Sequence, residues 1–299
     1  MIGDLGFGIR DSGDNRHVRP WLIALFLVAA PLGQERPLPD FDSFAAQVKK
    51  RLATDEERQS GYMFIERRTE QKVDGSGRPT SESVKVSEVY PGLPGEERYR
   101  RLIEENGRRI AADKLARQDR DRQERVESYV KAQASESQRQ KTAREREKAR
   151  RKTSAAIDDL FRIYDIRMIR REPTNGHVTI VATLDPKDGV KPQTDDGKIM
   201  RHFKARAWIS ESDYELVRIE IEAIRDLSFG LGLLARVHKG TVATFERRKV
   251  NNEVWLPAKV TWTASGRLLL IRRLRLRGIS EFSEYRKFTV AVHEILSVQ

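Results

Sequence analysis

The alternation of apolar and polar residues along the chain predicts mostly β-strands with a few helices. Residues 40–53 carry apolar side chains at the three- and four-residue spacing of an amphipathic helix, and Asp40 or Asp42 could cap it. These side chains are Phe41, Phe44, Val48 and Leu52. Residues 154–164 show the same spacing, so we expect a second short helix there.

After the first helix the period changes to two, which indicates strands. Two strands joined by the turn DGSGRP are followed by a hairpin with Asn106-Gly107 at its tip. From about residue 163 the pattern predicts further strands joined mostly by short turns; one of them places Val217, Ile219, Ile221 and Ala223 on one face. We therefore predict an α+β fold, a large curved antiparallel sheet with an apolar face that the two short helices cover.

Residues 111–152 consist almost entirely of Arg, Lys, Glu, Gln, Ser and Ala. Acid–base pairs four residues apart, such as Asp121/Arg125 and Glu147/Arg151, favour helix. The apolar a and d positions of a coiled coil are missing. We expect a long charged helical insert, a solvated helix or helix pair that is partly disordered, within the β domain.

A glycine-containing stretch, SFGLGLLARVHKG at residues 228–240, gathers large apolar side chains in a basic chain: Leu227, Phe229, Leu231, Leu233 and Leu234. A phosphate-binding loop is disfavoured, because the third glycine and the Lys-Ser/Thr of such loops are missing. Two interpretations stay open, a buried hairpin corner and an apolar lip that shields a hydrophobic cavity. Arg236 and Lys239 suit contact with anionic head groups, although a solvated cationic turn explains them equally.

The N-terminal residues resemble an export signal. Arg16, His17 and Arg19 precede an apolar run from Trp21 to Leu32, which is too short to span a bilayer and ends in small residues. The order of these parts predicts an N-terminal extension and signal peptide within residues 1–33 and a mature chain of residues 34–299. A buried N-terminal helix or an uncleaved anchor is the alternative.

Composition narrows the functional classes. The 299 residues carry a net charge of +12 and are 34% charged and 38% hydrophobic, so part of the chain packs no core. Residues 98–152 hold 19 Lys and Arg against 10 Asp and Glu, most of the excess. This segment could be a solvated helix or bind an anionic surface; nucleic acid is disfavoured because Tyr129 is the one aromatic residue between Ala111 and Lys152.

The sequence offers no catalytic constellation. It contains no cysteine, which removes disulfides, thiolate nucleophiles and cysteine metal sites. No histidine pair has the spacing of a helical metal site, and no G-x-S-x-G elbow is present. We therefore expect no enzymatic activity, no cofactor and no metal.

Two segments carry a resemblance to a known superfamily. Arg206–Glu222 is a strand ending in Trp-Ile, a polar turn and a strand containing Leu-Val-Arg-Ile, and Asn251–Val260 contains Trp255-Leu256-Pro257. Together with the order of signal, short helix, aromatic strand and long meander, they resemble the periplasmic lipoprotein carriers and their relatives, the LolA, LolB and RseB-like domains. The pattern extends over about residues 40–295, and the insert departs from it.

The resemblance implies an unclosed half-barrel whose concave cavity, plugged by helices, takes acyl chains of lipids or lipoproteins. On this basis we expect an exported periplasmic protein, soluble after signal cleavage and monomeric, that acts as a carrier or sensor. The alternative is a structural or interaction protein whose basic insert docks on an acidic partner, an anionic membrane or a cell-wall polymer.

The expected ligand-binding residues form the lip and the cavity wall, with two head-group contacts at Arg236 and Lys239. Trp208 and Trp262 have plain packing as an alternative role. The lip and wall residues are Leu227, Phe229, Leu231, Leu233, Leu234, Trp208, Trp255 and Trp262.

Overall fold

The computed structural model describes residues 36–93, 96–229, 235–268 and 272–287. Every element below belongs to one compact unit that begins at Leu38. The signal peptide predicted within residues 1–33 lies outside the described residues. Within the described ranges, no helix combines the length and apolarity needed to span a membrane.

The described residues contain four helices. They are α1 (Phe41–Gln59), α2 (Ala112–Gln133), α3 (Glu136–Ile163) and α4 (Asp195–Met200). The first predicted helix is confirmed, with the Asp40 carboxylate accepting a hydrogen bond from the Ser43 backbone N–H at 2.9 Å. The helix predicted at residues 154–164 is not a separate element, because it forms the last turns of α3.

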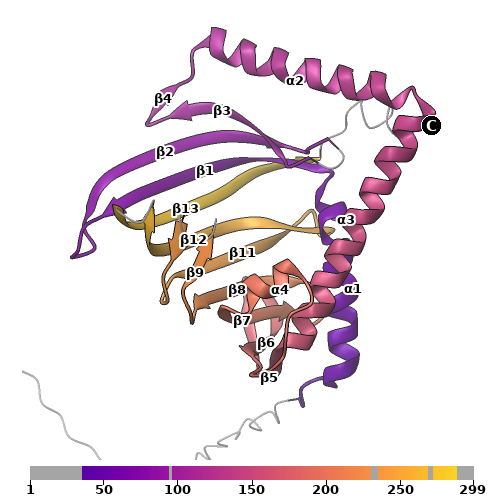
Figure 1. Ribbon diagram of the computed structural model, residues 1–299, viewed down its shortest axis with the longest axis vertical. Helices are drawn as coiled ribbons and strands as arrows, with labels where there is room; N and C mark the ends of the chain where they lie inside the picture. Colours follow the sequence, from indigo (N-terminus) through magenta and orange to yellow (C-terminus); the bar gives the residue numbers. More distant parts are fainter. Residues whose placement is uncertain (1–35, 94–95, 230–234, 269–271, 288–299) are drawn as a thin grey trace, which may run out of the picture. The chain divides into compact units, whose positions relative to one another are not determined.

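Thirteen strands in the described ranges form one antiparallel sheet (Figure 1). They are β1 (Tyr62–Val73), β2 (Pro79–Tyr90), β3 (Tyr99–Glu105), β4 (Arg108–Arg109), β5 (Tyr164–Thr174), β6 (His177–Pro186), β7 (Phe203–Ser210), β8 (Leu216–Ala223), β9 (Leu227–Phe229), β10 (Ala235–Val237), β11 (Val242–Val250), β12 (Val254–Leu268) and β13 (Arg272–Lys287). The main order is β4-β3-β2-β1-β13-β12-β11-β8-β7-β6-β5. Off this order, β10 pairs with β12, and β9 pairs with β10. The two ends of this order, β4 and β5, do not pair, so the predicted unclosed, half-barrel-type α+β sheet is confirmed.

The sheet departs from a simple meander in two places. Strand β1 pairs with β13, so the first hairpin is joined to the last strand of the described residues. The chain then leaves the sheet at one edge, β4, and re-enters at the opposite edge, β5. The charged segment is therefore the connection between the two edges rather than an appendage.

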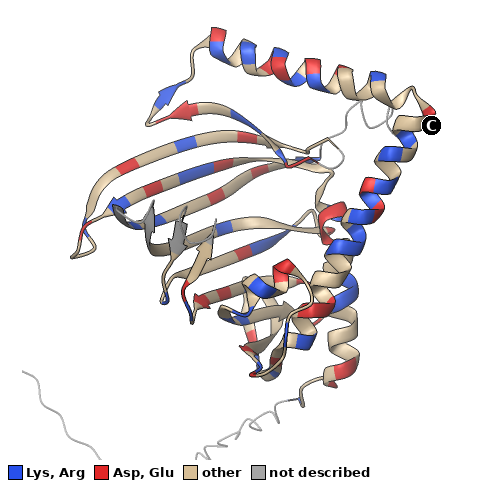
Figure 2. Cartoon of the chain, viewed as in Figure 1, with Lys and Arg blue, Asp and Glu red and all other residues tan. Residues whose placement is uncertain are grey.

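Helices α2 and α3 make this connection. Figure 1 shows α2 beside β3 and α3 running from the end of α2 to β5. At about 1.5 Å per residue they are about 33 and 42 Å long. The predicted helix pair is confirmed, whereas the partial disorder expected of it is not found, since residues 112–133 and 136–163 are helical. Figure 2 shows basic and acidic residues interspersed along both helices, and most of these residues are exposed.

Helix α2 also protects the edge of β3. The side-chain amide of Gln118 accepts a hydrogen bond from the Leu102 backbone N–H at 2.9 Å and donates one to the Leu102 carbonyl at 3.0 Å. Beside it, Asp119 pairs with Arg101 at 2.6 Å. These bonds occupy backbone groups that an exposed strand edge would otherwise offer to another chain.

One face of the sheet, which we call the helix-side face, packs against α1 and α3 at the β5–β7 end. Ile180 of β6 is buried with Phe44 and Val48 of α1. Leu184 and Ala207 are buried with Ile163 at the end of α3. Because side chains alternate along a strand, Val181 and Trp208 lie on the opposite face.

A buried carboxylate joins α3 to the loop before α4. Asp159 is 2% exposed and accepts hydrogen bonds from the backbone N–H groups of Gln193 and Thr194, both at 2.9 Å, and from the Thr194 hydroxyl at 2.8 Å. A Cβ at Gly197 would overlap this carboxylate, so glycine is required there. Burial acts to raise the pKa of Asp159, but the Thr194 and Gln193 hydrogen bonds and the Arg162 ion pair outweigh it and lower the pKa.

We predict that Asp159→Ala lowers the free energy of unfolding by about 3 kcal/mol, because three donors lose a buried, charged acceptor. A carboxylate with a lowered folded-state pKa stabilises the fold above its unfolded pKa, and the contribution is lost as the pH falls. In urea unfolding, the difference from the parent protein should therefore be full near neutral pH and shrink below about pH 4.

Asp158→Ala is the matched control. Asp158 is 60% exposed and pairs with Lys49 at 2.5 Å, so its loss should cost less than about 1 kcal/mol. Equal losses for the two variants, or a pH-independent loss for Asp159→Ala, would contradict the role of the buried carboxylate.

Candidate binding face of the sheet

The helix-side face continues past the helices as a patch of apolar side chains. The register connects Ala205 of β7 to Ile221, Ile221 to Ala243, and Ala243 to Trp262 across four neighbouring strands. The next row connects Ile219 to Phe245 and Phe245 to Val260. Directly opposite residues share a face, so these side chains form one surface. We call the following set the apolar patch: Ile221, Ala243, Phe245, Val260 and Trp262.

The apolar patch is half-buried. None of the four buried clusters in the described part of the chain contains Phe245, Val260 or Trp262. The clusters that include helix residues lie at the β5–β7 end. Large apolar side chains on strands β8, β11 and β12 are thus left with part of their surface in water.

Trp262 lies flat against the neighbouring strand at Gly278. A Cβ at Gly278 would come within 2.6 Å of three atoms of the indole ring. Glycine at this position therefore lets the ring approach the β13 backbone, and Gly278 is itself buried.

The same rows become charged beyond β13. Trp262 lies directly opposite Gly278 of β13, and Gly278 lies directly opposite Glu70 of β1. Val260 faces Ser280, Ser280 faces Arg68, and Arg68 faces Lys85 of β2. Along these rows the helix-side face is therefore apolar from β7 to β12 and ionic on β1 and β2, with the change at β13.

A buried ionic cluster fixes the C-terminal part of α1 to the strands. Arg247 is 1% exposed and donates to Asp55 Oδ1 of α1 at 2.6 Å and to the Trp255 carbonyl at 2.5 Å. Its Nη1 lies 3.6 Å from Glu215, which also pairs with Arg58 of α1. Two cations and two carboxylates are thus balanced in a contact where Arg247 and Glu215 are buried and Arg58 and Asp55 are partly exposed.

The sequence-predicted tryptophans occupy different environments. Trp208 and Trp255 are 5% and 1% exposed and are buried together with Val181 and Val217. The Arg218 guanidinium also lies over the Trp208 ring, 4.9 Å from the ring centroid. Trp262 is separate from them, half-buried on the apolar patch.

The predicted lip falls largely outside the described residues, which exclude Leu231, Leu233 and Leu234. Leu227 and Phe229 lie on β9, where they pair with Val237 and Ala235 of β10. Strand β10 continues along β12 as far as Leu268. The base of the lip is therefore on β9, which β10 joins to the strand that carries Trp262.

The predicted head-group contacts are close to this base. Arg236 is on β10 opposite Ser228, and Lys239 is an exposed turn residue whose backbone N–H donates to Asp226 at 2.9 Å. Asp226 also lies 3.2 Å from His238, so this turn carries charges of both signs. In the described residues, no three His, Asp or Glu side chains gather as metal ligands.

Searches for relatives give no match to a family model and none among curated proteins. Solved structures of similar chain path include an outer membrane lipoprotein-sorting protein domain from Vibrio parahaemolyticus, with 12% identity, a TM-score of 0.35 and coverage of 86% of this chain and 97% of that one. A DUF1329 family protein from Desulfovibrio piger has 10% identity, a TM-score of 0.27 and coverage of 82% and 92%.

MucB, solved in complex with MucA(peri), has 9% identity, a TM-score of 0.22 and coverage of 82% of this chain and 99% of that one. The comparison thus returns proteins of the class that the sequence resembles. The unclosed antiparallel sheet is shown by the strand order given above.

We predict that Gly278→Ala displaces the Trp262 indole from the β13 backbone, because the added methyl group overlaps the ring. Overpacking of this kind costs about 1–3 kcal/mol. Acrylamide quenching of tryptophan fluorescence should increase, since Trp208 and Trp255 are buried and Trp262 is the half-buried indole of the described residues.

Gly61→Ala is the control, because a Cβ there meets no atom within 4 Å. Unchanged quenching and stability in Gly278→Ala would show that Trp262 does not lie against this strand.

Proposed function

We propose that the protein binds a hydrophobic ligand, an acylated lipid or lipoprotein, on the apolar patch and acts as a carrier or sensor in an exported compartment. The observation that carries this proposal is the continuous row of half-buried apolar side chains that extends beyond the helices. A soluble protein that leaves such a surface partly in water has a surface ready for a ligand.

The energetics favour an acyl chain as the occupant. Each methylene group transferred from water to an apolar surface contributes about 0.8 kcal/mol. Several methylene groups along Ile221, Phe245 and Val260 therefore suffice for measurable affinity without any catalytic group. A ligand on the patch also removes the Trp262 ring from water.

The predicted lip would serve as the entrance to this surface. Strand β10 pairs with β12 from Gly266 to Leu268, a few residues beyond Trp262 on the same strand. We propose that the apolar residues Leu227 to Leu234 shield the end of the patch and that Arg236 and Lys239 meet an anionic head group. Trp208 and Trp255 then support the sheet from their buried cluster.

Export is part of this proposal, supported by the N-terminal pattern that resembles a signal peptide, and it can be tested directly. If the signal peptide within residues 1–33 is cleaved, protein recovered from the periplasm of an expressing bacterium should begin at or near Gln34. Intact-mass measurement and N-terminal sequencing identify the first residue of the recovered protein. A chain that keeps its N-terminal residues and stays in the membrane fraction would favour the uncleaved anchor.

A docking role for the basic helix pair is the second candidate, and the arginine-lined cavity described below favours it. Deletion of residues 111–152 is unsuitable as a test, because α2 and α3 connect the two edges of the sheet. Single charge substitutions on α2 leave this connection intact.

We predict that Val260→Glu abolishes retention of the hydrophobic ligand, because it places a carboxylate in the centre of the apolar patch. Native mass spectrometry of the purified mature protein, followed by organic extraction, measures the co-purified lipid. The affinity of the variant for the ligand should fall at least about tenfold, which is equivalent to about 1.4 kcal/mol of binding free energy.

Thr261→Glu is the matched control, since Thr261 is the next residue of β12 and faces the other side of the sheet. It should retain the ligand. An apo mass for the parent protein, with no binding of added phospholipid or lipopeptide, would contradict the proposal. Circular dichroism and thermal unfolding show whether both variants fold.

A further inference from the structure

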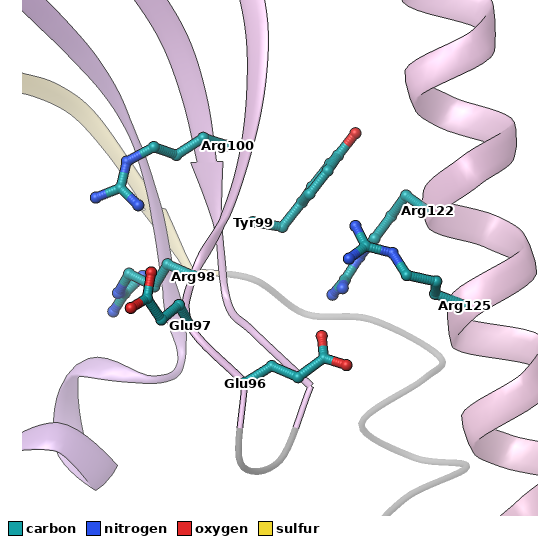
Figure 3. A pocket seen from close by; sticks show the side chains of 7 residues that line it. All are labelled: Glu96, Glu97, Arg98, Tyr99, Arg100, Arg122 and Arg125. Carbon is teal, nitrogen blue, oxygen red and sulfur yellow. The ribbon is translucent and has the colours of Figure 1, made fainter.

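A cavity of about 350 Å³ lies between the start of β3 and helix α2, on a part of the molecule that the apolar patch does not reach. Figure 3 shows that Arg122 and Arg125 extend from α2 towards Tyr99. The lining residues are Glu96, Glu97, Arg98, Tyr99, Arg100, Arg122 and Arg125. Four arginines around one small cavity give it an excess of positive charge.

Two of the guanidinium groups meet on one aromatic ring. The centroid of the Tyr99 ring lies 5.1 Å from the Arg122 guanidinium and 5.6 Å from that of Arg125. The Tyr99 hydroxyl donates to the Gln118 carbonyl of α2 at 2.9 Å, which holds the ring in place. Cation–π attraction orients the two planar groups side by side in spite of their like charge.

Arg122 occupies an unusual position for a cation. It lies on the half-buried stripe of α2 between Gln118 and Val126, where a helix normally presents an apolar side chain. Burial lowers the pKa of Arg122, and the charge of Arg125 lowers it further. One of its N–H groups donates to the Pro91 carbonyl at 3.1 Å. A guanidinium has five such donors, so most of them remain for another partner.

The other two arginines are already engaged. Arg98 donates to the carbonyls of Tyr62 and Gln59 at 2.7 and 2.5 Å, and Arg100 pairs with Glu66 at 2.9 Å. By contrast, within the described ranges neither Arg122 nor Arg125 has a carboxylate at ion-pair distance. Glu96 lines the cavity and attracts Arg122 electrostatically without reaching that distance.

We propose that this cavity is a binding site for a phosphate group, held by the guanidinium groups of Arg122 and Arg125 beside the Tyr99 ring. Arginine forks match phosphate oxygens in paired hydrogen bonds, which are stronger than bonds between neutral groups. The phosphate neutralises two like charges that otherwise repel each other in a partly buried place. This site is independent of the proposed ligand of the apolar patch.

Charge balance favours phosphate over carboxylate. A phosphate monoester carries about −1.5 to −2 charges at pH 7 and presents three acceptor oxygens, which match two cations. A single carboxylate leaves one guanidinium unbalanced. The phosphate could belong to a lipid head group or to a soluble ester, which share this chemistry.

Isothermal titration calorimetry of the full chain at low ionic strength, with inorganic phosphate and glycerol 3-phosphate as probes, tests the proposal. Arg125→Gln should weaken binding by at least about tenfold. Glu96→Gln should strengthen it a few-fold, because it removes a carboxylate that competes for Arg122. Arg125 is exposed, so its substitution leaves the half-buried stripe of α2 intact.

Arg120→Gln is the matched control, an exposed arginine of the same helix away from the cavity, and it should bind like the parent. If Arg120→Gln and Arg125→Gln weakened phosphate binding equally, the loss would come from the change in net charge alone. This result would overturn the proposal. No binding of either probe, or equally strong binding of a poly-glutamate peptide, would also overturn it.

Sedimentation with vesicles distinguishes the two sources of phosphate. Binding to phosphatidic acid in phosphatidylcholine, lost in Arg125→Gln and absent with phosphatidylcholine alone, identifies a head-group site. Binding of glycerol 3-phosphate without binding to these vesicles identifies a soluble ester as the ligand.

Discussion

An unclosed sheet imposes one constraint on the whole chain, which has to travel between two edges that never meet. Eleven neighbouring strands at about 4.8 Å spacing span on the order of 50 Å along the sheet. The chain leaves at β4 and returns at β5, so its connection must cover this span. Two consecutive helices provide the length with their backbone hydrogen bonds satisfied. Most of their surface meets water, which explains why residues 111–152 are so highly charged.

The same constraint leaves the helix-side face unevenly covered. The end of α3 stays at the β5–β7 end, whereas α1 packs there and reaches β11 with its C-terminal turns, where Arg247 pairs with Asp55 and Glu215. Breaking such a cluster leaves a buried charge without a partner, which typically costs about 3–5 kcal/mol. The exposed Lys49–Asp158 pair contributes far less. Displacing α1 to open the apolar patch would therefore cost several kcal/mol. A ligand that enters from the β9–β10 end would not have to displace α1.

Much of the fold follows from local patterns, and the rest depends on pairings that local patterns do not contain. Alternation predicts the strands, and Asn106-Gly107 predicts a hairpin tip that the structure forms with both residues at positive φ. The β1–β13 pairing and the edge-to-edge connection join residues far apart in sequence, so nothing local specifies them. The sequence predicts roles for Ile221 and Trp262 of the apolar patch but not for Phe245 and Val260, because these two become neighbours only through the register.

A local irregularity accounts for one wrong expectation. Alternation places Val217 on the face of Ile219, but the β7–β8 register shifts between Trp208 and Ile209, and Val217 is buried with Trp208 instead. A bulge adds one residue to a strand and turns the side chains on one side of it to the other face. No residue in this segment marks the bulge.

The charge gradient along the helix-side face argues for an amphiphile rather than a wholly apolar ligand. The row that begins at Ile221 and Trp262 ends at Glu70 on β1, and the adjacent row ends at Arg68 and Lys85. A long hydrocarbon lying across this boundary would remove ionic groups from water without replacing their hydrogen bonds. A molecule with one polar end would keep its chain on strands β8–β12, with its head group at the turn of Arg236 and Lys239 proposed above. The boundary at β13 would then limit the length of chain that the patch accepts.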